Sequence, residues 1–181
     1  MQLLRTAKEI EDMKWALRRY GSERDYFLFV FGINTGLRVS DMVPLTVGDV
    51  RGTTHVVIRE KKTNKTKRFM LPVKLREEIE DYTAHMSDGE YLFASRKGNG
   101  TQLHPHKLID YRALVKAGEV LGRDDIGTHT MRKTFGYAYY RRTKNLAFLQ
   151  NIFNHSAPSI TKRYIGITQD EIDETLKDFS L

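Results

Sequence analysis

The stretch "YFLFVFGINTGLRVSDMV", residues 26–43, joins a continuous apolar run to a glycine-containing break and a second short apolar pattern. Because "YFLFVFGI" is apolar on every side, it predicts a helix that is buried all round and lies at the centre of the fold. "NTG" predicts the end of that helix, and a short helix from Val39 to Val43 follows before Pro44. The sharp turn between the two helices carries Arg38.

Helix-start signals and one hairpin surround this central segment. Thr6 with Glu9 forms a capping box for a helix that presents apolar residues on one face as far as Tyr20, and Ser22 can begin the central helix itself. After the short helix, "THVVIRE" and "KRFMLP" predict two strands around a polar turn at 61–66. The hairpin is the only clear β signal in the sequence.

The remainder of the chain has helical periodicity. We predict helices at 73–86, about 105–121, 129–143, 146–153 and 157–164. Thr168 with Glu171 predicts a capping box for a last helix at 168–179, with Ile172, Leu176 and Phe179 on one side. The expected fold class is α+β, mostly helical, as a single domain over residues 1–181 with a small antiparallel β-hairpin.

Composition limits the class of protein. At 181 residues with 40% hydrophobic residues, the chain can bury a core of one domain, and its zero cysteines exclude disulfides, thiolate metal sites and cysteine nucleophiles. No apolar run reaches about 18 residues, so no membrane span is expected. The charged N-terminus does not resemble a signal peptide, which favours a cytoplasmic protein.

The net charge of +7 is unevenly distributed. Residues 51–74 hold eight Lys or Arg against one acid, and residues 128–164 hold seven and no acid. Residues 75–90 instead carry six acids, and the tail 165–181 carries five. Such segregation favours one or two positive surfaces that face a polyanion, although solvated basic loops would give the same counts.

The candidate chemistry lies in basic residues and one tyrosine without an acidic cluster. "HTMRKTF" places a histidine and an arginine three residues apart, on one helical face. Two guanidinium groups can hold the non-bridging oxygens of a phosphodiester, and a tyrosine becomes a nucleophile when a base takes its proton. The set suits metal-free phosphoryl transfer, with no cofactor expected, because a metal-dependent nuclease would need several carboxylates. Its members are Arg38, the hairpin lysines Lys61, Lys62 and Lys65, His129, Arg132, His155 and Tyr164.

Each of these side chains also has an ordinary structural explanation. Arg38 can pair with Asp41, and His129 can cap the start of a helix. His155 can be a solvated loop residue, and Tyr164 is one of nine tyrosines. Their coincidence in one chain, rather than any single residue, favours a catalytic site.

With these residues in this order, the chain resembles the catalytic domain of the tyrosine recombinase (phage integrase) family. "NTGLRVSDMVPLTVGDV" is similar to the first conserved box of that family, and "HTMRKTFG" resembles the H-x-x-R of its second box. "LQNIFNHSAPSITKRYI" resembles the segment that ends at the catalytic tyrosine, and "REKKTNKTKRFMLP" resembles the lysine hairpin. The resemblance extends from about Leu4 to the C-terminus, with the motifs in the family's order.

The resemblance implies a role for each matching residue. Arg38 and Arg132 would clamp the scissile phosphate, and His129 would assist proton transfer to or from the tyrosine. His155 would orient the phosphate, and Tyr164 would attack it, leaving a 3′-phosphotyrosyl bond and a free 5′ hydroxyl. Rejoining would need no ATP, because the phosphotyrosyl bond keeps the energy of the broken diester.

The same resemblance assigns the general acid to Lys62, which begins "KTN". The neighbouring Lys61 and Lys65 leave this assignment open to a shift in register. Two positions depart from the family pattern. Asp41 replaces a common glutamate, which would loosen the hold on Arg38, and Asn154 replaces a usual glycine at a turn where Asn tolerates positive φ.

The resemblance also implies partners. Double-stranded DNA is the expected substrate, bound by a homo-oligomer (a tetramer) in which helix 168–179 docks on a neighbouring protomer or else folds back on its own core. The family's N-terminal core-binding domain is not among these residues, so we expect either a fragment or a short recombinase. Two other functions stay open: a type IB topoisomerase, and a basic DNA-binding regulator without catalysis.

Overall fold

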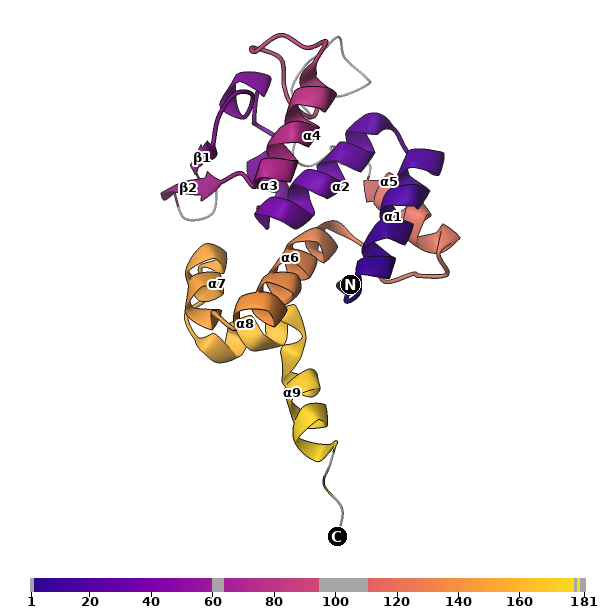
Figure 1. Cartoon of the computed structure of the whole chain (residues 1–181), viewed down its shortest axis with the longest axis vertical. Helices are drawn as coiled ribbons and strands as arrows, with labels where there is room; N and C mark the ends of the chain where they lie inside the picture. Colours follow the sequence, from indigo (N-terminus) through magenta and orange to yellow (C-terminus); the bar gives the residue numbers. More distant parts are fainter. Residues whose placement is uncertain (1, 60–63, 95–110, 178, 180–181) are drawn as a thin grey trace.

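The computed structural model describes residues 2–59, 64–94, 111–177 and 179 (Figure 1). Helices dominate, and the described strands form a two-stranded antiparallel sheet. The elements are α1 (Ala7–Tyr20), α2 (Glu23–Thr35), α3 (Val39–Met42), the 3-10 turn η1 (Val47–Asp49), β1 (His55–Arg59), β2 (Thr66–Met70), α4 (Val73–Thr83), α5 (Tyr111–Val120), α6 (Thr128–Thr143), α7 (Leu146–Phe153), α8 (Pro158–Ile165) and α9 (Ile167–Leu176). The predicted fold class is therefore confirmed.

Helix α2 lies at the centre of the larger of two hydrophobic clusters, as its all-apolar sequence predicts. Its residues from Tyr26 to Phe31 are all buried, and the helix packs against α1, α4, α5 and α6. The predicted capping box at Thr6 is present, and Ser22, the predicted start of α2, also forms one with Asp25. The hairpin lies at the edge of this cluster and contributes the buried side chains of Val56 and Ile58, both on β1, to it (Figure 1).

The second cluster joins α6, α7 and α8 to Leu3 near the N-terminus. Helix α8 approaches α6 closely at Gly136, where a Cβ would lie 2.6 Å from Ile165 and 2.8 Å from Phe153. Since real Cβ atoms do not approach carbon this closely, only glycine permits the approach. This packing places α8 and its Tyr164 against the helix that carries His129 and Arg132.

The predicted boundaries of two helices, α4 and α9, are wrong, because tertiary contacts override the local signals. Helix α4 ends at Thr83 rather than at 86, because the Arg51 guanidinium donates to the backbone carbonyls of Thr83 and Met86. The two carbonyls therefore accept hydrogen bonds from Arg51, and the helix does not continue through them.

The predicted Thr168 capping box does not form. Helix α9 begins at Ile167 and has Gly166, at φ +71°, as its N-cap, so Thr168 lies inside the first turn. Glu171 instead accepts hydrogen bonds from Lys162 at 2.8 Å and from Tyr140 at 3.1 Å. The helix ends at Leu176, and the side chain of Ile172 lies outside the described residues.

Predictions for three segments fall wholly or partly outside the described residues. These are the hairpin turn with Lys61 and Lys62, the first part of the helix predicted at 105–121, and the last residues of the tail. Within the described ranges, no helix combines the length and the hydrophobicity that a transmembrane span requires.

Candidate active site

Arg38 and Arg132 come from distant parts of the sequence and are joined through one tight turn. Arg38 follows Gly36, the left-handed C-cap of α2, and Arg132 lies on α6, where it is 5% exposed. The Arg132 Nη1 donates a hydrogen bond to the carbonyl of Gly36. A Cβ at position 36 would lie 2.2 Å from the Phe135 ring, so the turn packs directly on α6.

Both guanidinium groups also meet the C-terminal end of α7. The Arg132 Nη2 donates to the carbonyl of Ile152 at 3.3 Å, and the Arg38 Nη2 donates to the carbonyl of Phe153 at 3.3 Å. The Arg132 guanidinium additionally lies over the Phe153 ring, 4.4 Å from its centroid. The last carbonyls of α7 are therefore a common anchor for the two arginines.

Asp41 is the acidic partner of Arg38. Its carboxylate is buried, and its Oδ2 lies 3.7 Å from the Arg38 Nη1, which is long for a charged hydrogen bond. That the shorter side chain of Asp loosens the hold on this arginine stays a prediction.

Tyr164 reaches the same place from α8. Its hydroxyl lies 3.3 Å from the His129 Nδ1, and the two rings meet edge to face. Burial raises the pKa of Tyr164, whereas the charges of Arg132 and Arg38, and a hydrogen bond with Arg132, lower it. Because the net pKa is above its ordinary value, the phenol is protonated at neutral pH and needs a base to become a nucleophile.

His129 is suited to be that base. Burial lowers its pKa most, and the positive charges of Arg132, Lys133 and Arg38 lower it further. Below its ordinary value of about 6.5, this pKa leaves the imidazole neutral at pH 7. A neutral imidazole can accept the Tyr164 proton at Nδ1, at the distance observed.

His155 also lies beside the tyrosine ring. Its ring centroid lies 5.1 Å from that of Tyr164, and its Nδ1 is 3.0 Å from the hydroxyl of the buried Thr161. The turn before it depends on Asn154, which adopts φ +54° as the C-cap of α7. Asn at the glycine position thus keeps the left-handed turn, as the sequence predicts.

The lysine candidates are only partly described. Lys61 and Lys62 lie outside the described residues, while Lys65 is exposed and lines an open hollow of about 460 Å³ together with His155, Asn151 and Asn154. The hairpin therefore borders the site.

Sequence reasoning missed three contributors. Thr161 holds the His155 ring, Phe153 lies beneath Arg132, and Lys67 of β2 bonds to the C-terminus of α7. Only Thr161 left a readable signal, because three residues separate it from Tyr164 on one helical face. The other two depend on packing between segments that are far apart in the sequence.

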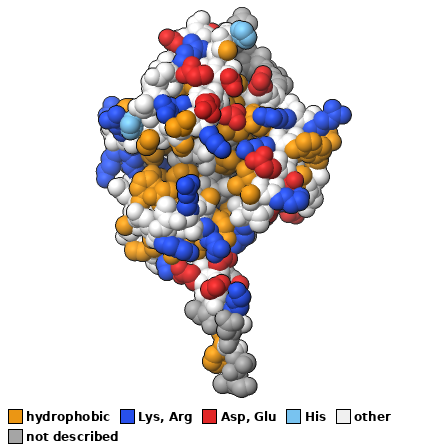
Figure 2. All heavy atoms as spheres, viewed as in Figure 1, with side chains coloured by type: hydrophobic (Ala, Val, Ile, Leu, Met, Phe, Trp, Pro, Cys, Tyr) orange, Lys and Arg blue, Asp and Glu red, His pale blue; other side chains and the backbone are white. Residues whose placement is uncertain are grey.

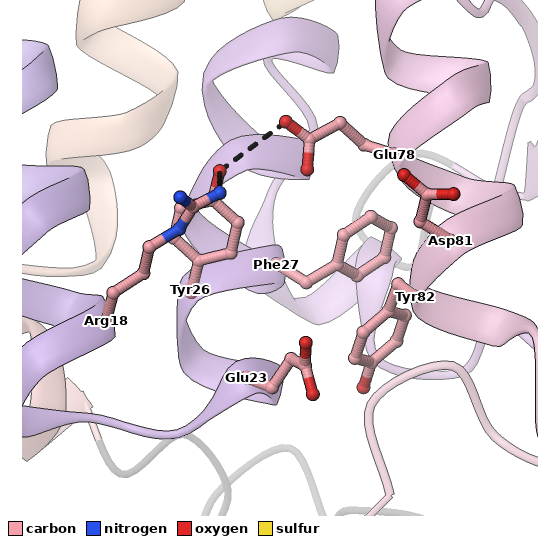
Figure 3. Close-up of a pocket in the computed structure, with 7 residues that line it drawn as sticks. All are labelled: Arg18, Glu23, Tyr26, Phe27, Glu78, Asp81 and Tyr82. Carbon is pink, nitrogen blue, oxygen red and sulfur yellow. Dashed lines mark hydrogen bonds between the residues drawn. The ribbon is translucent and has the colours of Figure 1, made fainter.

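A second hollow, elsewhere on the molecule, does not belong to this site. It measures about 410 Å³ and lies among α1, α2 and α4, where Arg18 contacts Tyr26, and Phe27 stacks on Tyr82 (Figure 3). Burial raises the pKa of Tyr82 to about 12, so this phenol stays protonated. None of the seven lining residues is among the candidate catalytic residues.

The charge distribution places basic residues around the site. In Figure 2, lysine and arginine side chains lie beside the hairpin and across the lower part of the body, over α6–α8. Carboxylates gather instead near the top, over α4, and at the base of α9. The segregation read from the sequence is thus also present on the folded surface.

Comparisons with known proteins agree on one family. The model of the phage integrase family matches residues 4–171. The probable integrase/recombinase YoeC of Bacillus subtilis is 45% identical over 179 residues, which cover 99% of this chain and 97% of that protein. Seven further curated recombinases match at 23–30% identity, and the chain spans only 40–59% of their lengths.

Solved structures share the fold at low sequence identity. The crystal structure of XerA recombinase superposes with a TM-score of 0.75 at 19% identity, covering 98% of this chain and 63% of that one. The catalytic domain of bacteriophage HP1 integrase superposes with a TM-score of 0.62 at 17% identity, covering 98% of this chain and 95% of that domain.

Proposed function

The chain belongs to the phage integrase family of tyrosine recombinases, DNA cleavage and rejoining enzymes, and we propose that Tyr164 is its nucleophile. The Tyr164 Oη attacks the scissile phosphorus, forming a 3′-phosphotyrosyl bond while the bond to the 5′ oxygen breaks. His129 accepts the phenol proton as attack proceeds. Attack by a free 5′ hydroxyl on the same phosphorus reverses the step, so rejoining needs no external energy source.

The arginines and His155 serve the phosphate. Arg38 and Arg132 hold the non-bridging oxygens, whose negative charge grows in the pentacoordinate transition state. With its Nδ1 next to Thr161, His155 offers Nε2 to a phosphate oxygen. Lys62 donates the proton that the departing 5′ alkoxide needs. Side chains of the protein itself thus stabilise the negative charge that develops on the phosphate oxygens and on the leaving 5′ oxygen.

One observation carries the proposal. The Tyr164 hydroxyl lies 3.3 Å from the His129 Nδ1, and the charges of Arg132 and Arg38 lower its pKa, which supports a common role for these four residues. A basic DNA-binding regulator would give no reason for a half-buried tyrosine to meet a neutral histidine and two phosphate-binding groups. The geometry therefore favours an enzyme over a regulator.

Relatives support DNA as the partner. A XerH recombinase has been crystallised with its difH substrate in a post-cleavage complex, and a lambda integrase as a dimer on a core site. The basic side chains over the hairpin and α6–α8 match a polyanion in charge (Figure 2). Site-specific recombination on double-stranded DNA, in the cytoplasm of a bacterial cell, is the function that fits best.

The C-terminal tail supports assembly on DNA. Arg5 donates to the Asp170 carboxylate at 2.7 Å and fixes the base of α9, which then projects away from the body (Figure 1). Leu176 and Phe179, at its far end, are 57% and 64% exposed. A tail whose apolar side chains are exposed in this way is suited to dock on a neighbouring protomer of a tetramer, a feature that DNA relaxation by a topoisomerase does not require.

Trapping of covalent adducts tests the chemistry. Nicked duplexes with a randomised core are incubated with the purified chain, and DNA that survives denaturation attached to protein is sequenced. Wild type should form an adduct and Tyr164→Phe should form none while binding DNA almost normally, since affinity comes mainly from phosphate contacts. Tyr139→Phe is the matched control and should keep the adduct. Persistence of the adduct in Tyr164→Phe would refute the assignment.

A strand-exchange assay separates recombination from relaxation. Two duplexes that carry the recovered site should exchange strands with wild type. Replacing Leu176 and Phe179 by serine should abolish exchange and leave single-site cleavage intact. Relaxation of supercoiled DNA without any strand exchange by the wild type would favour the topoisomerase alternative.

A further inference from the structure

Lys67 on β2 reaches from the hairpin to the helix end that anchors both arginines. Its ammonium donates to the carbonyl of Asn151 at 2.8 Å, to the carbonyl of Ile152 at 3.1 Å and to the Asn154 Oδ1 at 3.0 Å. An ammonium has three N–H donors, and three acceptors from four consecutive residues surround this one. So many bonds from one lysine fix the strand and the turn relative to each other.

The carbonyl of Ile152 is shared between Lys67 and the phosphate-binding site. Besides the Lys67 Nζ it accepts from the Arg132 Nη2 at 3.3 Å, and the next carbonyl, that of Phe153, accepts from the Arg38 Nη2. A helix C-terminus carries partial negative charge on these carbonyls. Because Lys67 also donates to the Ile152 carbonyl, it weakens the electrostatic attraction between that carbonyl and Arg132.

The third acceptor of Lys67 lies directly before His155. Asn154 holds the left-handed conformation that turns the chain from α7 to His155, and its side-chain oxygen accepts from Lys67. Movement of this turn would displace the His155 ring from Tyr164. Lys67 is therefore placed to set the positions of both Arg132 and His155.

We propose that Lys67 is a positioning residue for phosphoryl transfer, acting through Arg132 and His155 at the end of α7 and not as a proton donor. The inference rests on the proposed function of Tyr164. Removal of the Lys67 ammonium should misplace the groups that hold the non-bridging oxygens, while the nucleophile and the leaving-group acid keep their roles.

The test uses three versions of the DNA recovered from wild-type adducts. One has an ordinary scissile phosphate, one has sulfur at the bridging 5′ position, and one has a methyl group in place of a non-bridging oxygen. Sulfur makes the leaving group depart without a proton, whereas the methyl group removes the negative charge that an arginine must neutralise. The proteins are wild type, Lys67→Met, Lys67→Arg and, as a matched control on α5, Lys116→Met.

With ordinary DNA at saturation, Lys67→Met should cleave roughly ten- to a hundredfold more slowly than wild type, the range expected for misplacement by about 1 Å. The defect should persist on the sulfur substrate and largely disappear on the methyl substrate. Lys67→Arg should recover most of the rate, because a guanidinium also donates to carbonyls. Lys116→Met should match wild type, and melting temperatures should be similar.

Three results would overturn the inference. A normal rate for Lys67→Met would show that the contacts are dispensable, and rescue by sulfur would make Lys67 part of the proton-donating machinery. An equal defect on all three substrates would indicate a general structural effect. Absence of any adduct with wild type would instead refute the proposed function, so the two failures are distinguishable.

Discussion

Gly36 links the fold to the phosphate-binding site, and its replacement by alanine has a magnitude that the structure defines. The residue has φ +64°, a Cβ there would lie 2.2 Å from the Phe135 ring, and its carbonyl accepts from Arg132. Gly52 has the same φ of +64° with nothing within 4 Å of its Cβ position. Comparing the two alanine variants therefore separates the cost of the clash from that of backbone strain.

Gly52→Ala should lose only the roughly 1–2 kcal/mol that a left-handed conformation costs a residue with a Cβ. Gly36→Ala should lose this amount plus the roughly 1–3 kcal/mol typical of overpacking, because the ring of Phe135 must move. For a domain of this size each kcal/mol lowers the melting temperature by about 2–4 °C. Gly36→Ala should therefore melt roughly 2–12 °C below Gly52→Ala.

Thermal unfolding followed by circular dichroism measures this difference, and adduct formation well below both transitions measures the effect on the site. Gly36→Ala should also cleave more slowly than Gly52→Ala while both are folded, because the carbonyl that receives Arg132 shifts with the turn. Equal melting temperatures for the two variants would refute the packing argument. Equal cleavage rates would refute the connection between the turn and Arg132.

Three further predictions follow from the site. Cleavage should be unchanged in EDTA, because guanidinium groups supply the positive charge; loss of adduct in EDTA, restored by magnesium, would contradict the mechanism. In a pH–rate profile, the wild-type cleavage rate should be flat through neutral pH and fall on acidification below the lowered pKa of His129. Since the charge of Lys133 helps to lower that pKa, the rate of Lys133→Met should begin to fall at a higher pH. Lys62→Ala should lose about 10²–10⁴-fold on ordinary DNA and recover on the sulfur-bridged substrate; recovery by Lys65→Ala alone would shift the hairpin register by three.

Local signals predicted the parts of the fold that local physics controls. The all-apolar run of α2 has no face that water can solvate, so it predicted a central helix, and the capping boxes at Thr6 and Ser22 satisfy backbone donors within four residues. Helix ends that depend on distant partners were mispredicted. Arg51 ends α4, and Glu171 binds Lys162 and Tyr140 instead of capping α9.

The candidate site divides in the same way. The spacing of His129 and Arg132 predicted a shared helical face, and Tyr164 does meet His129. The sequence could not predict that both arginines would bond to the last carbonyls of α7, since no residue pattern records which backbone groups a distant side chain meets. For the same reason Lys67 was not among the predicted site residues.

The use of carbonyls as anchors is compatible with the absence of acids from the basic segment 128–164, to which Arg132 belongs. Cations that gather in one place repel each other and need compensation, and a carboxylate within their reach would compete with the phosphate for their hydrogen bonds. Carbonyls at a helix C-terminus carry about half a negative charge, spread over several groups. They can orient Arg38, Arg132 and Lys67 without neutralising them. The charge of Arg132 then stays available for the oxygens of the transferred phosphoryl group, whereas Arg38 also faces the carboxylate of Asp41.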